Sequence, residues 1–176
     1  MTVNIRQEKE SDYTAVFDLI EEAFRTEPMS DHAEHFLVER LRKSQAFIPE
    51  LSIVAEMDKR VIGHILLTRV TIENEMDKFD SLALAPVSVL PQYQKQGIGG
   101  MLIRYAHGKA RELGYGSVVL LGHEKYYPKF GYRPAESFGI QLPFDAPGEN
   151  CMIIELMINS LDGVKGIVEY PEEFYR

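Results

Sequence analysis

The chain has 176 residues, of which 45% are hydrophobic, with a formal net charge of −8 and a single cysteine. These values favour one domain with a sizeable core and argue against nucleic-acid binding, which normally requires a basic surface. No apolar run is long enough to span a membrane, and the charged N-terminus MTVNIRQEKESDY does not resemble a signal peptide. With one thiol the chain can form neither an internal disulfide nor a cysteine-rich metal site, so we expect a cytoplasmic protein without a metal.

The first half of the chain predicts a strand, two helices and three further strands. Residues 3–8 form the opening strand, and Ser11 or Asp12 can cap the helix that follows. Apolar residues of this helix recur at helical spacing: Val16, Leu19, Ile20, Ala23 and Phe24. A second helix from Asp31 to about Arg42 would turn Phe36, Leu37 and Leu41 inward. Residues 51–57 and 60–73 form a predicted hairpin, and residues 81–91 form the next strand.

The second half predicts a long helix, short strands and a C-terminal tail. The helix begins after the glycines of residues 97–100 and ends at Gly114. Residues 117–121 form a buried strand, and residues 138–144 and 151–158 form a last pair of strands. The core would span about residues 3–158, with a peripheral extension over about 159–176. This element order predicts a single-domain mixed α/β fold.

The stretch VLPQYQKQGIGG, residues 89–100, joins a strand to a helix through a glycine-rich turn. The first N–H groups of a helix have no partner within it, and the helix dipole adds positive charge there. Gly97, Gly99 and Gly100 lack the Cβ atoms that would keep an anion away, and Lys95 adds a charge. Neither a Walker loop nor a dinucleotide-binding fingerprint fits this spacing. The alternative is a tight turn that serves only packing.

A basic segment overlaps this turn. Between Pro91 and Arg111 there are four cations and no acid: Lys95, Arg104, Lys109 and Arg111. In an acidic chain such a segment favours an anionic ligand, although a solvated helix face would carry the same charges.

The spacing of Val89, Pro91, Gln94, Gly97 and Gly99 resembles the acetyl-coenzyme A signature of the GNAT N-acetyltransferases. A second match follows in YYPKFGY, which is similar to the aromatic–Tyr-x-x-x-Gly-aromatic segment of that family. Within the family, the chain is similar to the bacterial YhbS-like subgroup. The resemblance implies a GNAT acyl-CoA N-acyltransferase fold, in which helices flank a mixed central sheet of about six to seven strands.

The resemblance also implies where acetyl-CoA binds as a co-substrate. Backbone amides of the loop would hold the pyrophosphate, and Val87 and Val89 would bond the acetyl carbonyl and the pantetheine arm. Pro86 cannot donate a ladder hydrogen bond, so it marks an edge, a bulge or a strand start near this point. The family often has an asparagine where this chain has Leu120, so that contact is not carried over. The implied coenzyme-binding residues are Val87, Ser88, Val89, Gln94, Lys95, Gln96, Gly97, Ile98, Gly99 and Gly100.

For catalysis, the resemblance implies that Tyr127 is the general acid, which donates a proton to the leaving thiolate. A tyrosine hydroxyl stays protonated at neutral pH and can donate, although the adjacent Tyr126 would take this role after a shift of one residue. His123 is the candidate base, because the ordinary pKa of histidine suits that role, but a structural or solvated histidine is the alternative. Cys151 is expected to pack as a small buried apolar residue.

The acceptor is expected to be a small-molecule or peptide amine, bound beside the first two helices. The acidic connection between them would favour a cationic amine, although an ordinary solvated surface is the alternative. Candidate acceptor-site residues are Phe24, Met29, Asp80 and Ser81. Two rival functions remain: a regulatory module that binds acetyl-CoA without turnover, and a plain α/β domain. We expect a monomer or a homodimer.

Overall fold

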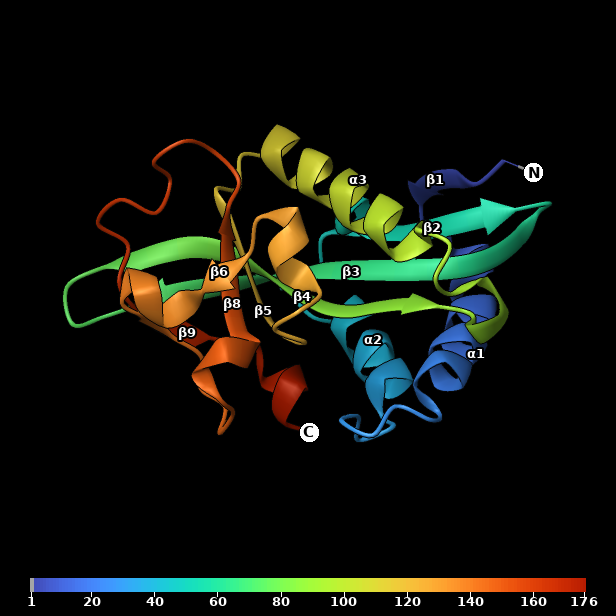
Figure 1. The fold of residues 1–176 in the computed structure, drawn as a ribbon, viewed down its shortest axis with the longest axis horizontal. Coiled ribbons are helices and arrows are strands. Elements are labelled where there is room, and N and C mark those ends of the chain that lie inside the picture. The colour runs from blue at the N-terminus through green and yellow to red at the C-terminus, as the bar shows by residue number, and fades with distance from the viewer. Residues whose placement is uncertain (1) are drawn as a thin grey trace.

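A computed structural model describes residues 2–176 and has one mixed sheet, in which the described residues form nine strands (Figure 1). The strand order is β1-β2-β3-β4-β5-β8-β6, with β9 paired to both β3 and β7. The expected α/β fold is confirmed, but six to seven strands were too few. The strands are β1 Asn4–Gln7, β2 Ser52–Met57, β3 Arg60–Glu73, β4 Lys78–Val89, β5 Ser117–Leu121, β6 Arg133–Pro134, β7 Ile140–Gln141, β8 Cys151–Glu155 and β9 Gly166–Glu169.

The centre of the sheet is the predicted hairpin of β2 and β3, extended by β4. These pairs are antiparallel, whereas β4 and β5 run parallel over a short stretch. Most residues of β3 are buried whichever way they point. A strand that is apolar on both sides needs cover on both faces of the sheet.

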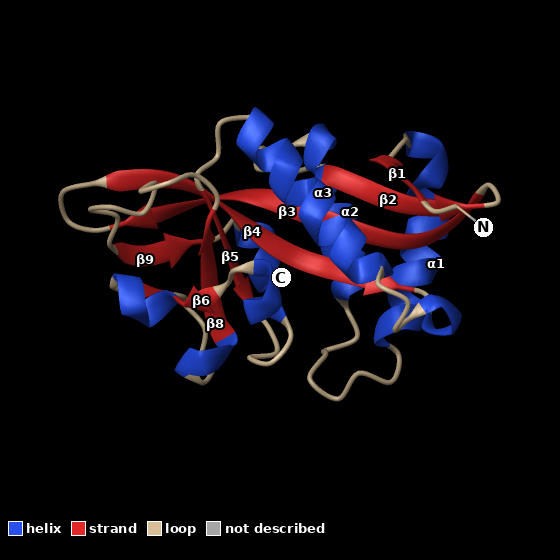
Figure 2. Cartoon of the chain, turned by 45° about the horizontal axis from the view of Figure 1, so that its top comes forward, coloured by secondary structure: helices blue, strands red, loops and turns tan. Residues whose placement is uncertain are grey.

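Helices supply that cover. They are α1 Tyr13–Phe24, α2 Glu34–Arg42 and α3 Ile98–Glu112. A Cβ atom on Gly63 of β3 would lie 3.0 Å from the Leu102 side chain, so Gly63 faces α3. The next residue, His64, points to the opposite face and belongs to a cluster that includes Arg42 at the end of α2. Figures 1 and 2 show α3 lying across the sheet, with α1 and α2 close to each other.

The two N-terminal helices differ from expectation in detail. Asp12 does not cap α1, because its carboxylate accepts hydrogen bonds from Arg6 and from the Lys9 N–H group. The second helix begins at Glu34, three residues later than predicted. Phe36 is 49% exposed, so its predicted inward position is wrong, and His35 is buried on this helix. His35 packs edge-on against Phe17 at 4.7 Å, a contact that helical spacing of aliphatic residues does not reveal.

The predicted pairing of residues 138–144 with 151–158 is wrong. Strand β8 lies between β5 and β6, while β7 pairs with β9. The C-terminal tail, expected to be peripheral, supplies β9, which pairs with β3 at Thr71, Ile72 and Glu73. Val168 of β9 is fully buried. Strands of two to four residues have too little sequence to show a clear period of two, which explains why β6 and β9 escaped prediction. Strand β7 lies within the predicted residues 138–144, but its partner was predicted wrongly.

Candidate active site

The glycine turn ends in a helix start whose N–H groups are free. Gly97 has a φ of 83°, a left-handed conformation that glycine adopts without strain, and a Cβ there would meet nothing within 4 Å. The first backbone bond of α3 runs from the Met101 N–H to the Gly97 carbonyl at 3.1 Å. The N–H groups of Ile98, Gly99 and Gly100 therefore have no partner within the helix.

A cavity of about 550 Å³ opens in front of these N–H groups. Seven of the ten predicted coenzyme-binding residues line it: Val89, Gln94, Lys95, Gly97, Ile98, Gly99 and Gly100. The other lining residues are Tyr93, Arg104, Tyr126, Lys129 and Phe130. Free N–H groups and three cations, Lys95, Arg104 and Lys129, make the cavity suitable for an anion.

Only part of the predicted basic segment belongs to this cavity. Arg104 folds back over the turn, since its Nη1 atom would lie 2.9 Å from a Cβ on Gly100. Lys109 instead pairs with Glu112, and Arg111 donates to the Leu156 carbonyl at 2.8 Å. Lys129 enters from the second motif, and its Nζ lies 4.1 Å from the centre of the Tyr126 ring.

Strand β4 carries a bulge at Pro86. Ile65 pairs with Val87 and Leu67 with Leu84, so two residues of β4, Ala85 and Pro86, oppose one residue of β3. The parallel pairing of β4 with β5 covers only Leu82 and Ala83. Beyond the bulge, β4 therefore has no paired neighbour on its β5 side among the described residues.

The ladder on the other side of β4 determines which backbone groups are free. The Leu90 N–H donates to the Ile62 carbonyl at 3.0 Å. Because bonding alternates along an antiparallel pair, Ser88 is turned toward β3, whereas Val87 and Val89 direct their N–H and C=O groups toward the β5 side. The Val89 carbonyl accepts a hydrogen bond from Gln94 Nε2 at 2.9 Å. Among these three residues, Ser88 alone has backbone groups directed toward β3.

The two adjacent tyrosines have different environments. Tyr126 lines the cavity, and its hydroxyl would lie 3.0 Å from a Cβ on Gly99. The Tyr127 ring lies against the end of β5, where a Cβ on Gly122 would meet it, and it packs edge-on against Tyr126 and Tyr132. Burial raises the pKa of the Tyr127 hydroxyl well above its usual range. Both hydroxyls remain protonated at neutral pH, because burial also raises the pKa of Tyr126.

His123 lies on the loop after β5 and faces the connection between α1 and α2. Its side chain is 64% exposed, and its Nε2 atom lies 3.7 Å from Glu27 Oε1. The structure thus brings the candidate base next to one acidic residue of the expected acceptor side. Phe24 packs on the core, whereas Met29 is 82% exposed.

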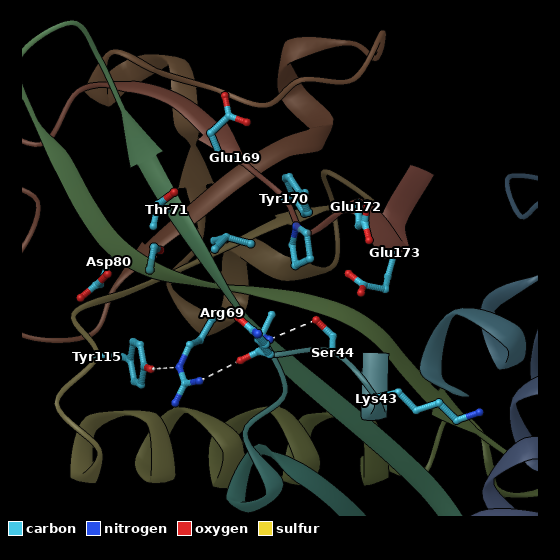
Figure 3. Close-up of a pocket in the computed structure, with 15 residues that line it drawn as sticks. Lys43, Ser44, Arg69, Thr71, Asp80, Tyr115, Glu169, Tyr170, Glu172 and Glu173 are labelled. Carbon is cyan, nitrogen blue, oxygen red and sulfur yellow. Dashed lines mark hydrogen bonds between the residues drawn. The ribbon is translucent and has the colours of Figure 1, made fainter. Parts of the chain in front are cut away.

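Asp80 and Ser81 do not join this group. They lie on the half of β4 before the bulge and line a separate cavity of about 600 Å³ (Figure 3). Ser81 is buried, and its hydroxyl lies 2.7 Å from that of Ser117. Arg69 in this cavity donates to the Tyr115 hydroxyl at 3.0 Å and to the Gln45 carbonyl at 3.1 Å. The two cavities have no lining residue in common.

Further properties follow from the described residues. Cys151 is buried among apolar side chains, and burial raises the pKa of its thiol. Over residues 2–176, no cluster of three or more His, Cys, Asp or Glu side chains is arranged to hold a metal ion. Within the same range, no helix has both the length and the apolar character needed to cross a membrane.

Sequence reasoning missed several residues of the glycine-turn cavity. Tyr93, Lys129 and Phe130 line it, and Tyr126 reaches it rather than Tyr127. No spacing in the sequence reveals that YYPKFGY lies over the glycines. Spacing alone does not reveal which ring of a tyrosine pair faces the cavity.

Known proteins resemble this chain in sequence and structure. Residues 4–135 match the family profile described as an acetyltransferase (GNAT) domain. The uncharacterized N-acetyltransferase YhbS of Escherichia coli K12 is 30% identical over 173 residues, which cover 98% of each chain. The uncharacterized N-acetyltransferase YjhQ of the same organism is 40% identical over 115 residues, which cover 65% of this chain and 64% of YjhQ, just under two thirds of its length.

Two solved structures resemble the fold closely. The E. coli YhbS structure, in complex with CoA, superposes with a TM-score of 0.89 at 28% identity and covers 99% of this chain and 92% of that one. The structure of a GNAT family acetyltransferase from Brucella melitensis, in complex with acetyl-CoA, has a TM-score of 0.79 at 32% identity, and the match covers 98% of each chain. The expected resemblance is therefore confirmed, and the chain belongs to the GNAT family of N-acetyltransferases.

Proposed function

We propose that this protein transfers the acetyl group of acetyl-CoA directly to an amine. The observation that carries the proposal is the set of three free N–H groups at the start of α3, which open into a cavity bordered by Lys95, Arg104 and Lys129. A diphosphate needs such hydrogen-bond donors and such charge. The binding of CoA and acetyl-CoA by the two structural relatives supports the same ligand.

The chain offers matched partners along the length of the coenzyme. The loop from Gln94 to Gly100 would hold the pyrophosphate. The free backbone groups of Val87 and Val89 would bond the pantetheine arm as a neighbouring strand does, after Gln94 releases the Val89 carbonyl. The Val87 N–H would donate to the acetyl oxygen, where negative charge develops during transfer.

Two side chains would handle protons. Tyr127 would donate its hydroxyl proton to the leaving sulfur. Because its pKa is raised, the hydroxyl is protonated at neutral pH before transfer begins. His123 remains a candidate base on the solvent side, where its Nε2 atom lies 3.7 Å from Glu27 Oε1.

The acceptor is proposed to be a cationic amine that enters between the α1–α2 connection and the end of β5. Glu27 and His123 meet there, a further carboxylate lies on the same connection at Asp31, and another lies at Glu34, the first residue of α2. Phe24 and Met29 belong to this side of the molecule. Asp80 and Ser81 line the other cavity, so the proposal does not include them.

The deciding experiment is a calorimetric titration of the protein with acetyl-CoA, and separately with CoA, followed by acetyl transfer to a panel of polyamines, aminoglycosides and lysine peptides. One-to-one binding with turnover of at least one amine is expected. Binding without turnover of any amine would favour the regulatory module. No binding at a protein concentration that detects a millimolar constant would contradict the proposal and leave the packing turn as the explanation.

A further inference from the structure

The loop that follows β5 is held by an asparagine from a distant part of the chain. Strand β5 lies beside β8 (Figure 1), and the last pair of their ladder is Leu121 with Cys151. One residue further on, the Gly122 N–H donates to the Asn150 carbonyl at 2.9 Å. Asn150 is the last residue of a short 3-10 helix, Gly148–Asn150, that leads into β8. The contact between Gly122 and Asn150 therefore extends the sheet past the ends of both strands.

The side chain of Asn150 completes this pair. Two residues that are hydrogen-bonded across an antiparallel ladder exchange two N–H···O bonds. The Asn150 N–H does not supply the second bond, because it donates to the Pro147 carbonyl at 3.0 Å within its own turn. The side-chain Nδ2 atom donates to the Gly122 carbonyl instead, at 2.9 Å. Both backbone groups of Gly122 are thus bonded to the same residue.

The amide of Asn150 also reaches the residue after His123. Its Nδ2 atom donates to Glu124 Oε2 at 3.2 Å. An amide nitrogen carries two protons, so it can make this bond and the bond to Gly122 at once. One side chain therefore contacts the residue before and the residue after the candidate base.

Gly122 lies directly against the ring of Tyr127. A Cβ atom on Gly122 would lie 2.5 Å from Tyr127 Cε2 and 3.0 Å from Cδ2. The Cε2 atom is bonded to the ring carbon that carries the hydroxyl. Gly122 does not have the positive φ that usually requires glycine, so it is the ring that excludes a side chain at this position.

The Tyr127 ring has aromatic neighbours on other sides. It packs edge-on against Tyr126, with the ring centres 5.0 Å apart, and against Tyr132 at 5.7 Å. Tyr132 is buried, and its hydroxyl lies 2.8 Å from His107 Nε2. Because such rings are closely packed, a side chain at position 122 would displace the edge of Tyr127 that carries the hydroxyl.

We propose that Gly122 and Asn150 are positioning residues for acetyl transfer. This inference rests on the proposed function, in which Tyr127 protonates the leaving sulfur. Gly122 leaves the space in which the Tyr127 ring lies, and Asn150 holds Gly122 there through both of its backbone groups. Neither residue lines the glycine-turn cavity, so both act on the rate through Tyr127 and not on coenzyme binding. A displacement of about 1 Å is enough to impair a positioned catalytic group.

The other end of β5 provides matched controls. Gly116 precedes the strand, and its carbonyl accepts a hydrogen bond from Ser160 Oγ at 2.7 Å. A Cβ atom on Gly116 would lie 2.7 Å from Ser160 Cβ. Gly116→Ala therefore crowds the same strand, and Ser160→Ala removes a similar hydrogen bond, at the end of β5 that lies away from Tyr127.

The first test measures the contact without turnover. Carbon NMR of protein labelled in its tyrosine rings resolves Tyr127, whose signals are assigned by their loss in Tyr127→Phe. These signals should shift in Gly122→Ala and in Asn150→Ala, and they should stay in place in the two control variants. Unshifted Tyr127 signals in Gly122→Ala would overturn the inference and leave the proposed function unaffected.

The second test measures kcat in two backgrounds. With Tyr127 present, Gly122→Ala should lower kcat about 30-fold and Asn150→Ala about tenfold, with unchanged acetyl-CoA affinity. In the Tyr127→Phe background the same two changes should lower kcat by no more than about twofold, because the donor that they would displace is already absent. Both control variants should keep kcat within about twofold of the wild type in either background.

A role in stability alone predicts a different pattern. Equal losses with and without the Tyr127 hydroxyl, or a similar loss in Gly116→Ala, would overturn the inference, as would a Tyr127→Phe variant with the full rate. If Gly122→Ala does not fold, Asn150→Ala gives the same comparison without an added atom. If the wild type acetylates no amine, the proposed function fails and the positioning role fails with it, whatever the NMR signals show.

Discussion

The glycine-turn cavity and the cavity around Arg69 are similar in size, at about 550 and 600 Å³. They differ in how many of their hydrogen-bond donors are free to bind a ligand. At the glycine turn, three backbone N–H groups have no helical partner and three cations surround the opening. In the other cavity, Arg69 already donates to Tyr115 and Gln45 (Figure 3). Four carboxylates also line that second cavity: Asp80, Glu169, Glu172 and Glu173.

Volume alone would therefore favour the cavity that the proposed function does not use. An anionic ligand gains less from an arginine that already donates to two oxygens, and carboxylates near the opening oppose it. Unsatisfied donors beside a left-handed glycine indicate a binding site more reliably than the space in front of them. The following predictions test this contrast, beginning with the largest expected effect.

Gly99→Glu should weaken acetyl-CoA binding about 1,000-fold, because it adds a carboxylate where the diphosphate would accept hydrogen bonds, and its Cβ would approach the Tyr126 hydroxyl at 3.0 Å. Calorimetry measures the loss. Gly108→Glu makes the same charge change on the same helix, where a Cβ meets nothing within 4 Å, and should bind normally. Similar binding by the two variants would show that the coenzyme does not bind at the glycine turn.

Tyr127→Phe should lower kcat about 100-fold and leave acetyl-CoA affinity unchanged, because only a proton donor is lost. Tyr126→Phe is the matched control, since it removes the neighbouring hydroxyl that lines the cavity. Steady-state rates of both variants, with calorimetry, decide the assignment. If Tyr126→Phe loses the rate and Tyr127→Phe keeps it, the acid is Tyr126.

Lowering the pH should reduce the free energy of unfolding through a buried histidine on α3, close to the glycine turn. Burial lowers the pKa of His107 on α3 to about 4, and its Nε2 lies 2.8 Å from the hydroxyl of Tyr132, which packs on Tyr127. Between pH 6.5 and 4 the unfolded chain binds the proton more readily, so the free energy of unfolding should fall by about 2 kcal/mol through this histidine.

Denaturant unfolding at several pH values measures this slope. His107→Gln should flatten it, although the lost hydrogen bond lowers stability at every pH. A slope that is unchanged in His107→Gln would show that other groups cause the acid sensitivity.

Lys95→Glu should weaken acetyl-CoA binding about tenfold at low salt and less at high salt, because salt screens exposed charges. Lys109→Glu reverses an equal charge at the other end of α3, where Lys109 pairs with Glu112, and should have little effect on binding. Calorimetry at two ionic strengths compares them. Equal losses would mean that net charge, rather than position at the cavity, governs affinity.

The smallest effect is expected in the second cavity. Arg69→Gln should leave acetyl-CoA affinity and kcat unchanged, because its guanidinium serves Tyr115 and Gln45. Asp80→Asn should behave in the same way, which also tests the sequence-based assignment of Asp80 to the acceptor site. A clear loss of amine turnover in either variant would connect the two cavities and contradict the contrast drawn here.

Sequence reasoning predicted those parts of the fold where the chain carries a long or unusual pattern. The hairpin of β2 and β3 and helix α3 follow from periodicity and glycine, and the bulge at Pro86 is one of the three alternatives that the proline left open. The short strands β6, β7 and β9 form because distant segments present backbone groups to one another, and a pattern of two to four residues cannot reveal this.

The same limit applies to the site. The glycine loop was predicted because its proposed function depends on backbone N–H groups, and closely spaced glycines mark backbone that a ligand can approach. The position of Lys129 depends on how the second motif folds over the first. Interactions between residues far apart in the sequence follow from the tertiary structure, which no local window contains.

The C-terminal strand has a practical consequence for handling the protein. Strand β9 hydrogen-bonds to β3, and Arg40 of α2 donates to the Glu173 carbonyl at 3.1 and 3.2 Å. Trimming the chain before Gly166 to aid crystallisation would expose one edge of β3 and remove the hydrogen bonds of Arg40 in α2 to the Glu173 carbonyl. Flexible additions are better placed in the loop at Asn74–Asp77, between β3 and β4, whose residues are largely exposed.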